Sequence, residues 1–226
     1  MRIGVLFSGG KDSTLAIHRA VEKEEVVCLI CLNSKNPESY MFHTPNIDVT
    51  LLQAKALNLP IINKTTKGIK EEELVDLKVA IKQAIRLHKI EGIVTGAVES
   101  VYQAERVQRI CNKLNLWCFN PLWKSNQKEL LEETVNDGFK TIISGIFAYP
   151  LDDSWLGKEL DSNLIEKLVD LQKKFGLSPS GEGGEIETTV LDAPLFKKRI
   201  RILSSFTSSK GNSGIFKIEK AELIEK

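Results

Sequence analysis

The segment that most constrains this chain is Ser8-Gly9-Gly10-Lys11-Asp12-Ser13. It follows a short apolar run, residues 3–7, that predicts a buried strand. It precedes residues 15–20, whose pattern predicts a helix with Asp12 or Ser13 near its first turn. The two glycines let the backbone approach an anion closely because no Cβ intervenes, and a helix start presents unpaired N–H groups at the positive end of its dipole. The segment therefore predicts an anion site, with phosphate as the favoured ligand.

An ordinary strand-to-helix turn with a capped helix is the alternative to a phosphate site. The hydroxyl groups of Ser8 and Ser13, together with Lys11 at the end of the first expected strand, favour phosphate. The segment lacks the spacing of a Walker A loop and that of the glycine-rich dinucleotide motif. Any nucleotide bound here is therefore held by a different kind of loop.

Composition excludes several classes of protein. The chain has 226 residues, enough for one large domain or one domain with a sizeable appendage. Its 31 Lys and Arg residues balance 30 Asp and Glu residues, so a net charge of +1 gives no reason to expect a nucleic-acid partner. No apolar run approaches the ~18 residues of a membrane span. Because Met1 leads directly into the first strand, we expect no signal peptide and a cytoplasmic protein.

The spacing of Cys28 and Cys31 matches a CxxC pair, but their context argues against a metal or redox site. Both lie in an apolar stretch, residues 26–32, that predicts a strand. Alternation along a strand points the two side chains to opposite faces, so we expect buried thiols.

Strands and helices alternate through the first half of the chain, which predicts an α/β fold with a Rossmann-like parallel sheet. After the first strand and helix, strands are expected at residues 26–32 and 59–62, from residue 92, and at 116–119, and helices at residues 47–57, 71–88 and 102–109. The pattern changes near residue 125, which predicts a core domain of residues 1–125 and a smaller α+β domain of residues 126–226.

The second domain is expected to mix helices and strands. Helices are predicted at residues 129–135 and 163–175, and strands at residues 141–147, 190–191, 198–203 and 215–218. The last two strands are expected to flank a turn-rich loop, residues 208–214. Their edge is a candidate surface for a homodimer.

Polar residues follow the expected strands where ligands bind in parallel sheets. Asn33 comes at the end of the second strand, as a candidate for the nucleoside, although an ordinary loop start explains it nearly as well. Gly96, Glu99 and Ser100 follow the strand that begins at residue 92. His43 lies in a loop bracketed by prolines, where it is either a general base or, with no acidic neighbour, a hydrogen-bonding loop residue.

The helix after Ser100 carries Tyr102, Gln103 and Arg106. Helical spacing places Tyr102, Arg106 and Arg109 on one face, where an arginine can hold phosphate or carboxylate. A solvated helix surface with ion pairs explains the same spacing.

A second chemical signature lies in residues 180–189. Three carboxylates, Glu182, Glu185 and Glu187, stand among glycines that include Gly183 and Gly184. Such a cluster can bind Mg²⁺ or ammonium or act as a base, although a flexible acidic loop is the alternative. Residues 185 and 187 share parity, so an extended backbone would point both carboxylates to one face. No His and Cys cluster indicates zinc.

These motifs resemble those of known enzymes. The Ser-Gly-Gly-Lys-Asp-Ser segment resembles the PP-loop of the ATP pyrophosphatases, which split ATP between its α- and β-phosphates. The Glu-rich segment with residues 191–196 that follow it resembles the signature of the diphthine–ammonia ligase (diphthamide synthetase) family, as do residues 40–43, 121–123 and 156–157. The resemblance covers nearly the whole chain and implies an adenine nucleotide alpha hydrolase-like core.

The resemblance also implies a reaction. Diphthine, a modified histidine of translation elongation factor 2, would be amidated by ammonium through an acyl-adenylate. ATP would be consumed, and Mg²⁺ would be required as a cofactor. Ser8, Gly9, Gly10, Lys11, Asp12, Ser13, Asn33 and Gly96 would bind ATP, and the catalytic candidates are Asp12, Glu182, Glu185 and Glu187. Substrate-binding candidates are His43, Glu99, Ser100, Tyr102, Gln103, Arg106, Gly183 and Gly184.

Two features depart from the family pattern. Ile186 stands where the family often carries an aromatic residue, and the chain ends without the further domains of longer eukaryotic relatives, which suggests an archaeal-type enzyme. Two other functions remain open at this point. One is a PP-loop enzyme that modifies tRNA, and the other is an ATP-binding protein without turnover.

Overall fold

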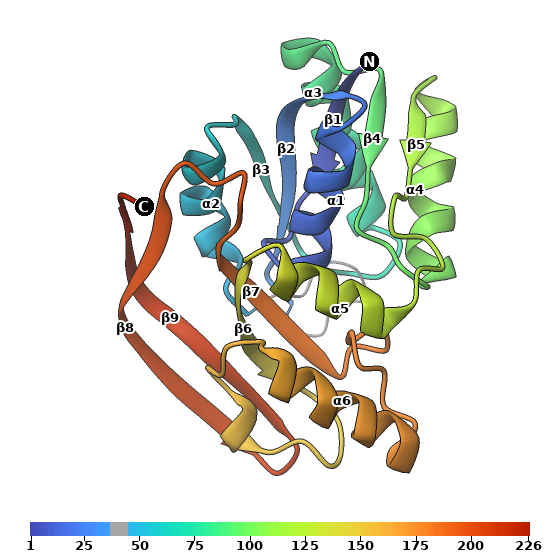
Figure 1. The fold of residues 1–226 in the computed structure, drawn as a ribbon. Coiled ribbons are helices and arrows are strands. Elements are labelled where there is room, and N and C mark those ends of the chain that lie inside the picture. Colours follow the sequence, from blue (N-terminus) through green and yellow to red (C-terminus); the bar gives the residue numbers. More distant parts are fainter. Residues whose placement is uncertain (37–44) are drawn as a thin grey trace.

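The computed structural model describes residues 1–36 and 45–226, and it contains two sheets (Figure 1). The first is a five-stranded parallel sheet in the order β3-β2-β1-β4-β5. Its strands are β1 (Arg2–Leu6), β2 (Glu25–Ser34), β3 (Ile61–Thr66), β4 (Gly92–Val94) and β5 (Trp117–Phe119). The predicted α/β class with a parallel, Rossmann-like core is confirmed.

Helices cover both faces of this sheet and bury side chains against it. The helices are α1 (Lys11–Val21), α2 (Thr50–Leu57), α3 (Glu73–His88) and α4 (Val101–Lys113), with a short 3₁₀ turn, η1 (Ile47–Val49), before α2. One core holds the buried residues of α1 and α2, and a separate core holds those of α3 and α4. The chain order reverses at β1, which lies between β2 and β4, so a crevice forms where these strands end.

The second sheet is antiparallel, in the order β7-β6-β9-β8. Its strands are β6 (Lys140–Ile146), β7 (Ile186–Asp192), β8 (Arg199–Lys210) and β9 (Ser213–Ile224). The helices α5 (Gln127–Asn136) and α6 (Ser162–Phe175) and the 3₁₀ turn η2 (Asp153–Trp155) accompany it. Buried side chains of α5, α6 and β6 form a third core.

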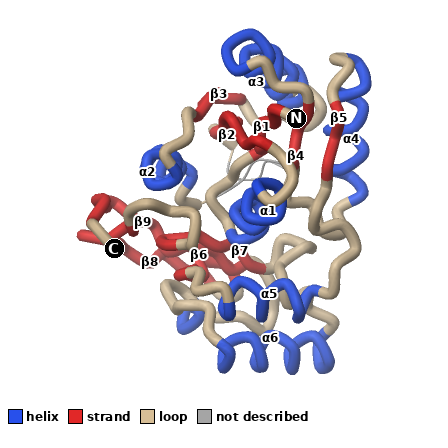
Figure 2. Tube along the Cα trace, turned by 45° about the horizontal axis from the view of Figure 1, so that its top comes forward, coloured by secondary structure: helices blue, strands red, loops and turns tan. Residues whose placement is uncertain are grey.

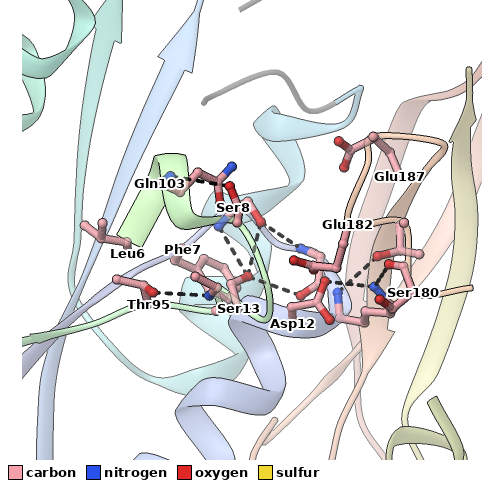
Figure 3. A pocket seen from close by; sticks show the side chains of 18 of the residues that line it. Leu6, Phe7, Ser8, Asp12, Ser13, Thr95, Gln103, Ser180, Glu182 and Glu187 are labelled. Carbon is pink, nitrogen blue, oxygen red and sulfur yellow. Dashed lines mark hydrogen bonds and ion pairs between the residues drawn. The ribbon is translucent and has the colours of Figure 1, made fainter. Parts of the chain in front are cut away.

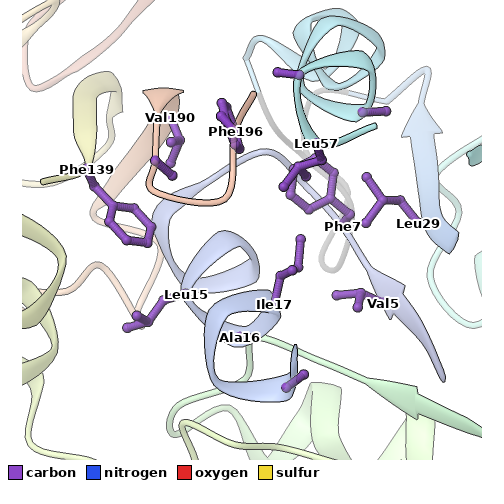
Figure 4. Close-up of a cluster of buried hydrophobic side chains, with 14 of the residues drawn as sticks. Val5, Phe7, Leu15, Ala16, Ile17, Leu29, Leu57, Phe139, Val190 and Phe196 are labelled. Carbon is purple, nitrogen blue, oxygen red and sulfur yellow. The ribbon is translucent and has the colours of Figure 1, made fainter. Parts of the chain in front are cut away.

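The two sheets are joined through α1, which lies between the parallel sheet and β7 (Figure 2). Leu15 of α1, Phe139, Val190 and Phe196 belong to one buried cluster with residues of the first sheet (Figure 4). Because this core draws on both halves of the chain, burial of its apolar surface holds the β7 strand against α1.

The C-terminal hairpin differs from the prediction. The loop expected at residues 208–214 is mostly strand, since Lys210 pairs with Ser213 and only Gly211 and Asn212 lie between them. Gly211 has a φ of 61°, which a tight two-residue turn requires and glycine adopts readily. The polar serines suggested a loop, but their backbone groups pair across the hairpin and their side chains face solvent.

The cysteines lie as predicted. Cys28 and Cys31 are fully buried on opposite faces of β2, Cys28 in the core beneath α3 and Cys31 with its Sγ 3.7 Å from Thr50 Oγ1 of α2. Burial raises the pKa of the Cys28 thiol to about 12 and that of the Cys31 thiol to about 11. Neither is therefore a reactive thiolate. Among the described helices, none has the length and continuous apolar character that a membrane span requires.

Candidate active site

A cavity of about 570 Å³ opens where β1 and β4 end (Figure 3). Its walls come from the N-termini of α1 and α4 and from the start of β7 with the loop before it. One end is apolar, lined by Leu6, Ile30, Leu32, Leu77 and Val107. The other end is polar and carries the hydroxyl and carboxyl groups of both sequence motifs. The cavity thus offers an apolar recess beside an anion site, within one space.

The phosphate-loop candidate forms a compact turn at the polar end. Ser8 N donates to Ser13 Oγ at 3.3 Å, and Gly10 N donates to Ser8 Oγ at 3.4 Å. Gly10 is the N-cap of α1 and receives no side-chain capping bond, so the helix start is not closed by its own cap residue. This leaves hydroxyl groups and a helix N-terminus at the cavity, as a phosphate site requires.

Glycine is needed at two positions beside this end of the cavity. Gly9 has a φ of 82°, and a Cβ there would lie 2.3 Å from Gln53 Oε1. A Cβ on Gly96 would lie 2.7 Å from Ser13 N and 2.8 Å from the carbonyl carbon of Asp12. The β4–α4 connection therefore packs directly against the first turn of α1, which only glycine at position 96 permits.

Lys11 links the two motifs. Its side chain is only 3% exposed, and Nζ donates to Asp12 Oδ2 at 2.8 Å and to the Ser180 carbonyl oxygen at 2.5 Å. Lys11 N also donates to Thr188 Oγ1 at 3.1 Å. The lysine charge is therefore held between the phosphate loop and the Glu-rich segment, where it compensates nearby carboxylates.

The three glutamates of the Glu-rich segment have different surroundings. Glu182 Oε2 accepts from Glu99 N at 2.9 Å, and its side chain lines the cavity. The Glu187 carboxyl also lines the cavity and has no hydrogen-bond partner within the described part of the chain. Glu185 is turned back to its own loop, where it accepts from Gly183 N at 2.9 Å and Ser178 N at 3.0 Å. The expectation that Glu185 and Glu187 share a face is therefore wrong, because the backbone is a tight turn, not a strand, before Ile186.

Burial raises the pKa of the Glu187 carboxyl from an ordinary 4.5 to about 8. The Lys11 charge opposes this rise, while the negative charges of Asp12 and Glu182 add to it. Burial also raises the pKa of Glu182, with a further contribution from Asp12 and opposition from the Glu99 N–H group. The Glu187 carboxyl, with its pKa of about 8, exchanges its proton near neutral pH, which suits a general acid or base.

The structure brings most of the predicted residues together. Those that line the cavity are Ser8, Gly10, Lys11, Asp12, Ser13, Gly96, Ser100, Tyr102, Gln103, Glu182, Gly183, Gly184 and Glu187. Gly9, Asn33, Glu99, Arg106 and Glu185 do not line it. His43 lies outside the described residues.

The outlying residues have other contacts. The Gly9 carbonyl accepts from Gln53, Asn33 pairs with Thr65 of β3, and Arg106 forms an ion pair with Glu71. The Arg106 guanidinium also stacks on Tyr102, 3.4 Å from the ring centroid. Arg109 pairs with Glu105 on the helix surface. Both arginines therefore form ion pairs, which is the alternative to a ligand-binding role that the helical spacing left open.

Two glutamines that the sequence did not single out organise the site. Gln53 Nε2 donates to the carbonyl oxygens of Gly9 at 2.8 Å and Val190 at 2.7 Å. Gln127 holds the loop before β7 through its side-chain amide. A single glutamine within a helix has no recognisable sequence pattern. Thr95, Ser180 and Thr188 also line the cavity and were missed, although Thr95 directly follows β4.

The carboxylates at the cavity can supply part of a metal site. Within residues 1–36 and 45–226, no group of three or more His, Cys, Asp or Glu side chains is close enough to hold a metal ion alone. Mg²⁺ is commonly bound by one or two carboxylates together with nucleotide phosphates. Asp12 and Glu182, both at the polar end, fit that requirement.

Comparison with known proteins identifies the family of this chain. The diphthamide synthase N-terminal domain profile matches residues 1–117, and the C-terminal domain profile matches residues 126–224. Diphthine–ammonia ligase of Bos taurus is 37% identical over 225 residues, which cover 91% of this chain and 84% of the bovine protein. Diphthine–ammonia ligase of Schizosaccharomyces pombe is 37% identical over 217 residues, which cover 88% of this chain and 36% of that protein.

A solved structure described as a predicted subunit of tRNA methyltransferase from Methanocaldococcus jannaschii aligns with a TM-score of 0.45 and 20% identity, over 85% of this chain and 97% of the other. That similarity is too low to bear on function. The two profiles, by contrast, match both halves of the sequence. The chain therefore belongs to the diphthamide synthase family.

Proposed function

We propose that this protein amidates the carboxylate of diphthine on translation elongation factor 2, with ammonium as nitrogen source, and converts ATP to AMP and pyrophosphate. The support is the family membership, with relatives named diphthine–ammonia ligase that match over most of the chain. The observation that carries the mechanism is the cavity in which the phosphate loop and the Glu182 and Glu187 carboxyls meet.

The polarity of the cavity supports one orientation of ATP. The apolar end formed by Leu6, Ile30, Leu32, Leu77 and Val107 suits the adenine ring, and the loop of residues 8–13 suits the phosphates. The start of α1 and the Ser8 and Ser13 hydroxyls provide donors, and Lys11 provides positive charge. Mg²⁺, held by Asp12 and Glu182 together with the phosphates, would neutralise phosphate charge.

The first step would activate the carboxylate. A carboxylate oxygen of diphthine attacks the α-phosphorus of ATP, the bond from that phosphorus to the bridging oxygen of the β-phosphate breaks, and pyrophosphate leaves. Charge grows on the leaving group, where the N–H and hydroxyl groups of residues 8–13 and the Lys11 ammonium can stabilise it. The product of this step is an acyl-adenylate.

The second step would deliver nitrogen. Ammonium bound beside Glu187 favours the ionised carboxylate, since an opposite charge lowers the pKa that burial has raised. Glu187 then accepts a proton from ammonium, and the resulting ammonia attacks the acyl carbon. The bond from that carbon to the adenylate oxygen breaks, AMP leaves, and the nitrogen gives up one further proton to solvent. We assign Glu182 to holding the cation and Glu185 to fixing the loop, in line with their contacts.

The reaction can be tested with purified components. ATP, ammonium and elongation factor 2 bearing diphthine should give AMP and pyrophosphate, together with diphthamide detected by mass spectrometry. Glu187→Gln should lower kcat by about 10²–10⁴-fold while ATP still binds. Glu105→Gln, which alters only a surface ion pair with Arg109, is the matched control. Release of ADP in place of AMP would contradict the proposal.

We further infer a cytoplasmic setting, because the substrate is a translation factor. A homodimer formed along the outer edge of β8, the last strand of the second sheet, stays a prediction. No nucleic-acid partner is proposed, since the net charge is +1.

A further inference from the structure

Gln127 occupies an unusual place for a helix residue. It is the first residue of α5, and the preceding Asn126 already caps this helix by accepting from the backbone N–H groups of Lys128 and Glu129. The Gln127 side chain is therefore not needed to satisfy the helix start. It reaches instead to two loops that border the cavity, although it does not line the cavity itself.

The Gln127 amide oxygen is the meeting point of the loop before β7. It accepts from Ser178 Oγ at 2.7 Å, Ser180 Oγ at 2.9 Å and Ser180 N at 3.2 Å. Ser180 is only 2% exposed, and its carbonyl oxygen accepts from Lys11 Nζ. The Gln127 amide oxygen therefore holds Ser180, and Ser180 in turn anchors the buried Lys11 of the phosphate loop.

The Gln127 amide nitrogen reaches the other loop. Nε2 donates to Glu99 Oε2 at 3.2 Å, and Glu99 N in turn donates to Glu182 Oε2 at 2.9 Å. Only a side chain with an acceptor on one branch and a donor on the other satisfies both sides. A carboxylate at position 127 would repel the Glu99 carboxylate. An apolar side chain there would leave the donors of Ser178 and Ser180 without their acceptor.

We propose that Gln127 is a positioning residue for the amidation reaction, which holds Ser180 and, through Glu99, Glu182 at the ATP site. The inference rests on the proposed function for the reaction that it serves. Gln127 touches no substrate; it acts through the loop of residues 178–185 and the connection between β4 and α4. Its loss should loosen both loops together and misplace the groups that contact the reactants.

Three variants test the role. Gln127→Ala should lower kcat about 10–100-fold, the scale of a small misplacement of catalytic groups, and change the Kd for ATP less than about threefold. Gln127→Glu should also lose activity, because two carboxylates then face each other. In the double variant Gln127→Glu with Glu99→Gln, the donor and acceptor exchange places, and kcat should return to within about threefold of wild type.

The matched control is Gln108→Ala, which removes a surface glutamine whose amide donates to Asn112. It should leave kcat and the Kd for ATP unchanged. Thermal unfolding of each variant checks that the fold is kept. A double variant no more active than Gln127→Glu, or a fully active Gln127→Ala, would overturn the proposal.

A second measurement does not depend on turnover. In hydrogen exchange without ligand, the backbone N–H groups of Ser180 and Glu99 should exchange faster in Gln127→Ala, because both loops lose the side chain that holds them. Exchange should slow again in the double variant. If the wild-type protein failed to form diphthamide, the proposed function would fail, and this exchange would still decide the positioning role. Unchanged exchange of both groups in Gln127→Ala would count against that role.

Discussion

At the scale of single residues, Glu187 shows how the site departs from what stability alone would favour. The carboxyl is partly buried, has no hydrogen-bond partner within the described residues, and lies near Asp12 and Glu182. Burying an ionisable group without a partner is unfavourable, so the fold tolerates it by retaining a proton. Such an arrangement is typical of functional sites, where groups must exchange protons near neutral pH.

This arrangement predicts a pH-dependent stability difference. Between the ordinary pKa of 4.5 and the folded value of about 8, the unfolded chain has released the Glu187 proton while the folded protein retains it. The unfolded state therefore binds fewer protons, and the stability of the wild type falls as pH rises through this window. Glu187→Gln removes the titration, so above pH 8 its Tm should exceed that of the wild type by several degrees. The gap between the two pKa values sets an upper limit of ~5 kcal/mol on the effect, which partial exposure of the carboxyl to water reduces.

Near pH 4.5 the two proteins should unfold within about 1 °C of each other, because the Glu187 carboxyl is then protonated in the folded state. Calorimetry across the pH range measures both values. A Tm difference that is independent of pH would contradict the assigned pKa.

Gly96 allows a second prediction at this scale. Gly96→Ala places a Cβ within 2.7 Å of Ser13 N, so the β4–α4 connection and the start of α1 must separate. We expect ATP to bind about tenfold or more weakly, equivalent to ~1.4 kcal/mol, and the free energy of unfolding to fall by ~1–3 kcal/mol. Isothermal titration calorimetry and denaturant unfolding measure the two effects.

The control for Gly96→Ala is Ile165→Val in the third core, a buried site away from the cavity. It should cost a similar ~0.5–1.5 kcal/mol of stability without changing the affinity for ATP. Equal ATP affinities for wild type and Gly96→Ala would show that the close packing at residue 96 does not shape the phosphate site.

At the scale of elements, Glu185 stabilises the loop before β7, whereas Glu182 and Glu187 face the cavity. Glu185→Ala removes the acceptor for Gly183 N and Ser178 N, so the loop should loosen and kcat should fall about tenfold. Because Glu185 is proposed to hold the loop and not to transfer protons, the pH profile of kcat/KM should keep its shape. In Glu187→Gln the limb that rises through about pH 8 should disappear.

Hydrogen exchange of residues 178–185 provides the structural measurement for this loop, with faster exchange expected in Glu185→Ala. Glu166→Ala, on the exposed face of α6 where it pairs with Lys128, is the control and should change neither exchange nor rate. Loss of the pH-dependent limb in Glu185→Ala would assign the proton transfer to Glu185 instead.

The elements themselves were predictable to different degrees. The strand and helix within residues 3–20 could be predicted because their patterns depend only on neighbouring residues in the chain. Both β1 and α1 form as expected. The hairpin of β8 and β9 was underestimated, since its serine-rich half has no apolar alternation. Cross-strand pairing, which depends on the partner strand, extends it through those polar residues.

At the scale of the whole molecule, ligand binding should stabilise both halves of the chain together. The cavity takes residues from the parallel sheet, from α4 and from β7, so ATP would bridge the two sheets. At a concentration of 100 times the Kd, bound ATP adds about 2.7 kcal/mol, which raises the Tm by ~5–10 °C. Calorimetry should show one transition with and without ATP.

Lys11→Met tests the same bridge, because Lys11 joins the phosphate loop to Ser180 in the loop before β7. In this variant the ATP-induced rise in Tm should be lost or reduced severalfold, whereas Glu105→Gln should keep it. Two separate transitions in the wild type, with only the first shifted by ATP, would show that the nucleotide does not connect the halves.

The sequence by itself determined the α/β core and the two motifs, since each depends on residues close together in the chain. Most of the site residues that it singled out line the cavity. Only the tertiary structure decided which glutamate faces the cavity, that Glu185 is an anchor within its loop, and that Gln53 and Gln127 hold the site together. These depend on contacts between segments far apart in sequence, such as Lys11 with Ser180, and on how deeply each group is buried. Distances and dielectric surroundings arise only when the chain has folded, so no local pattern encodes them.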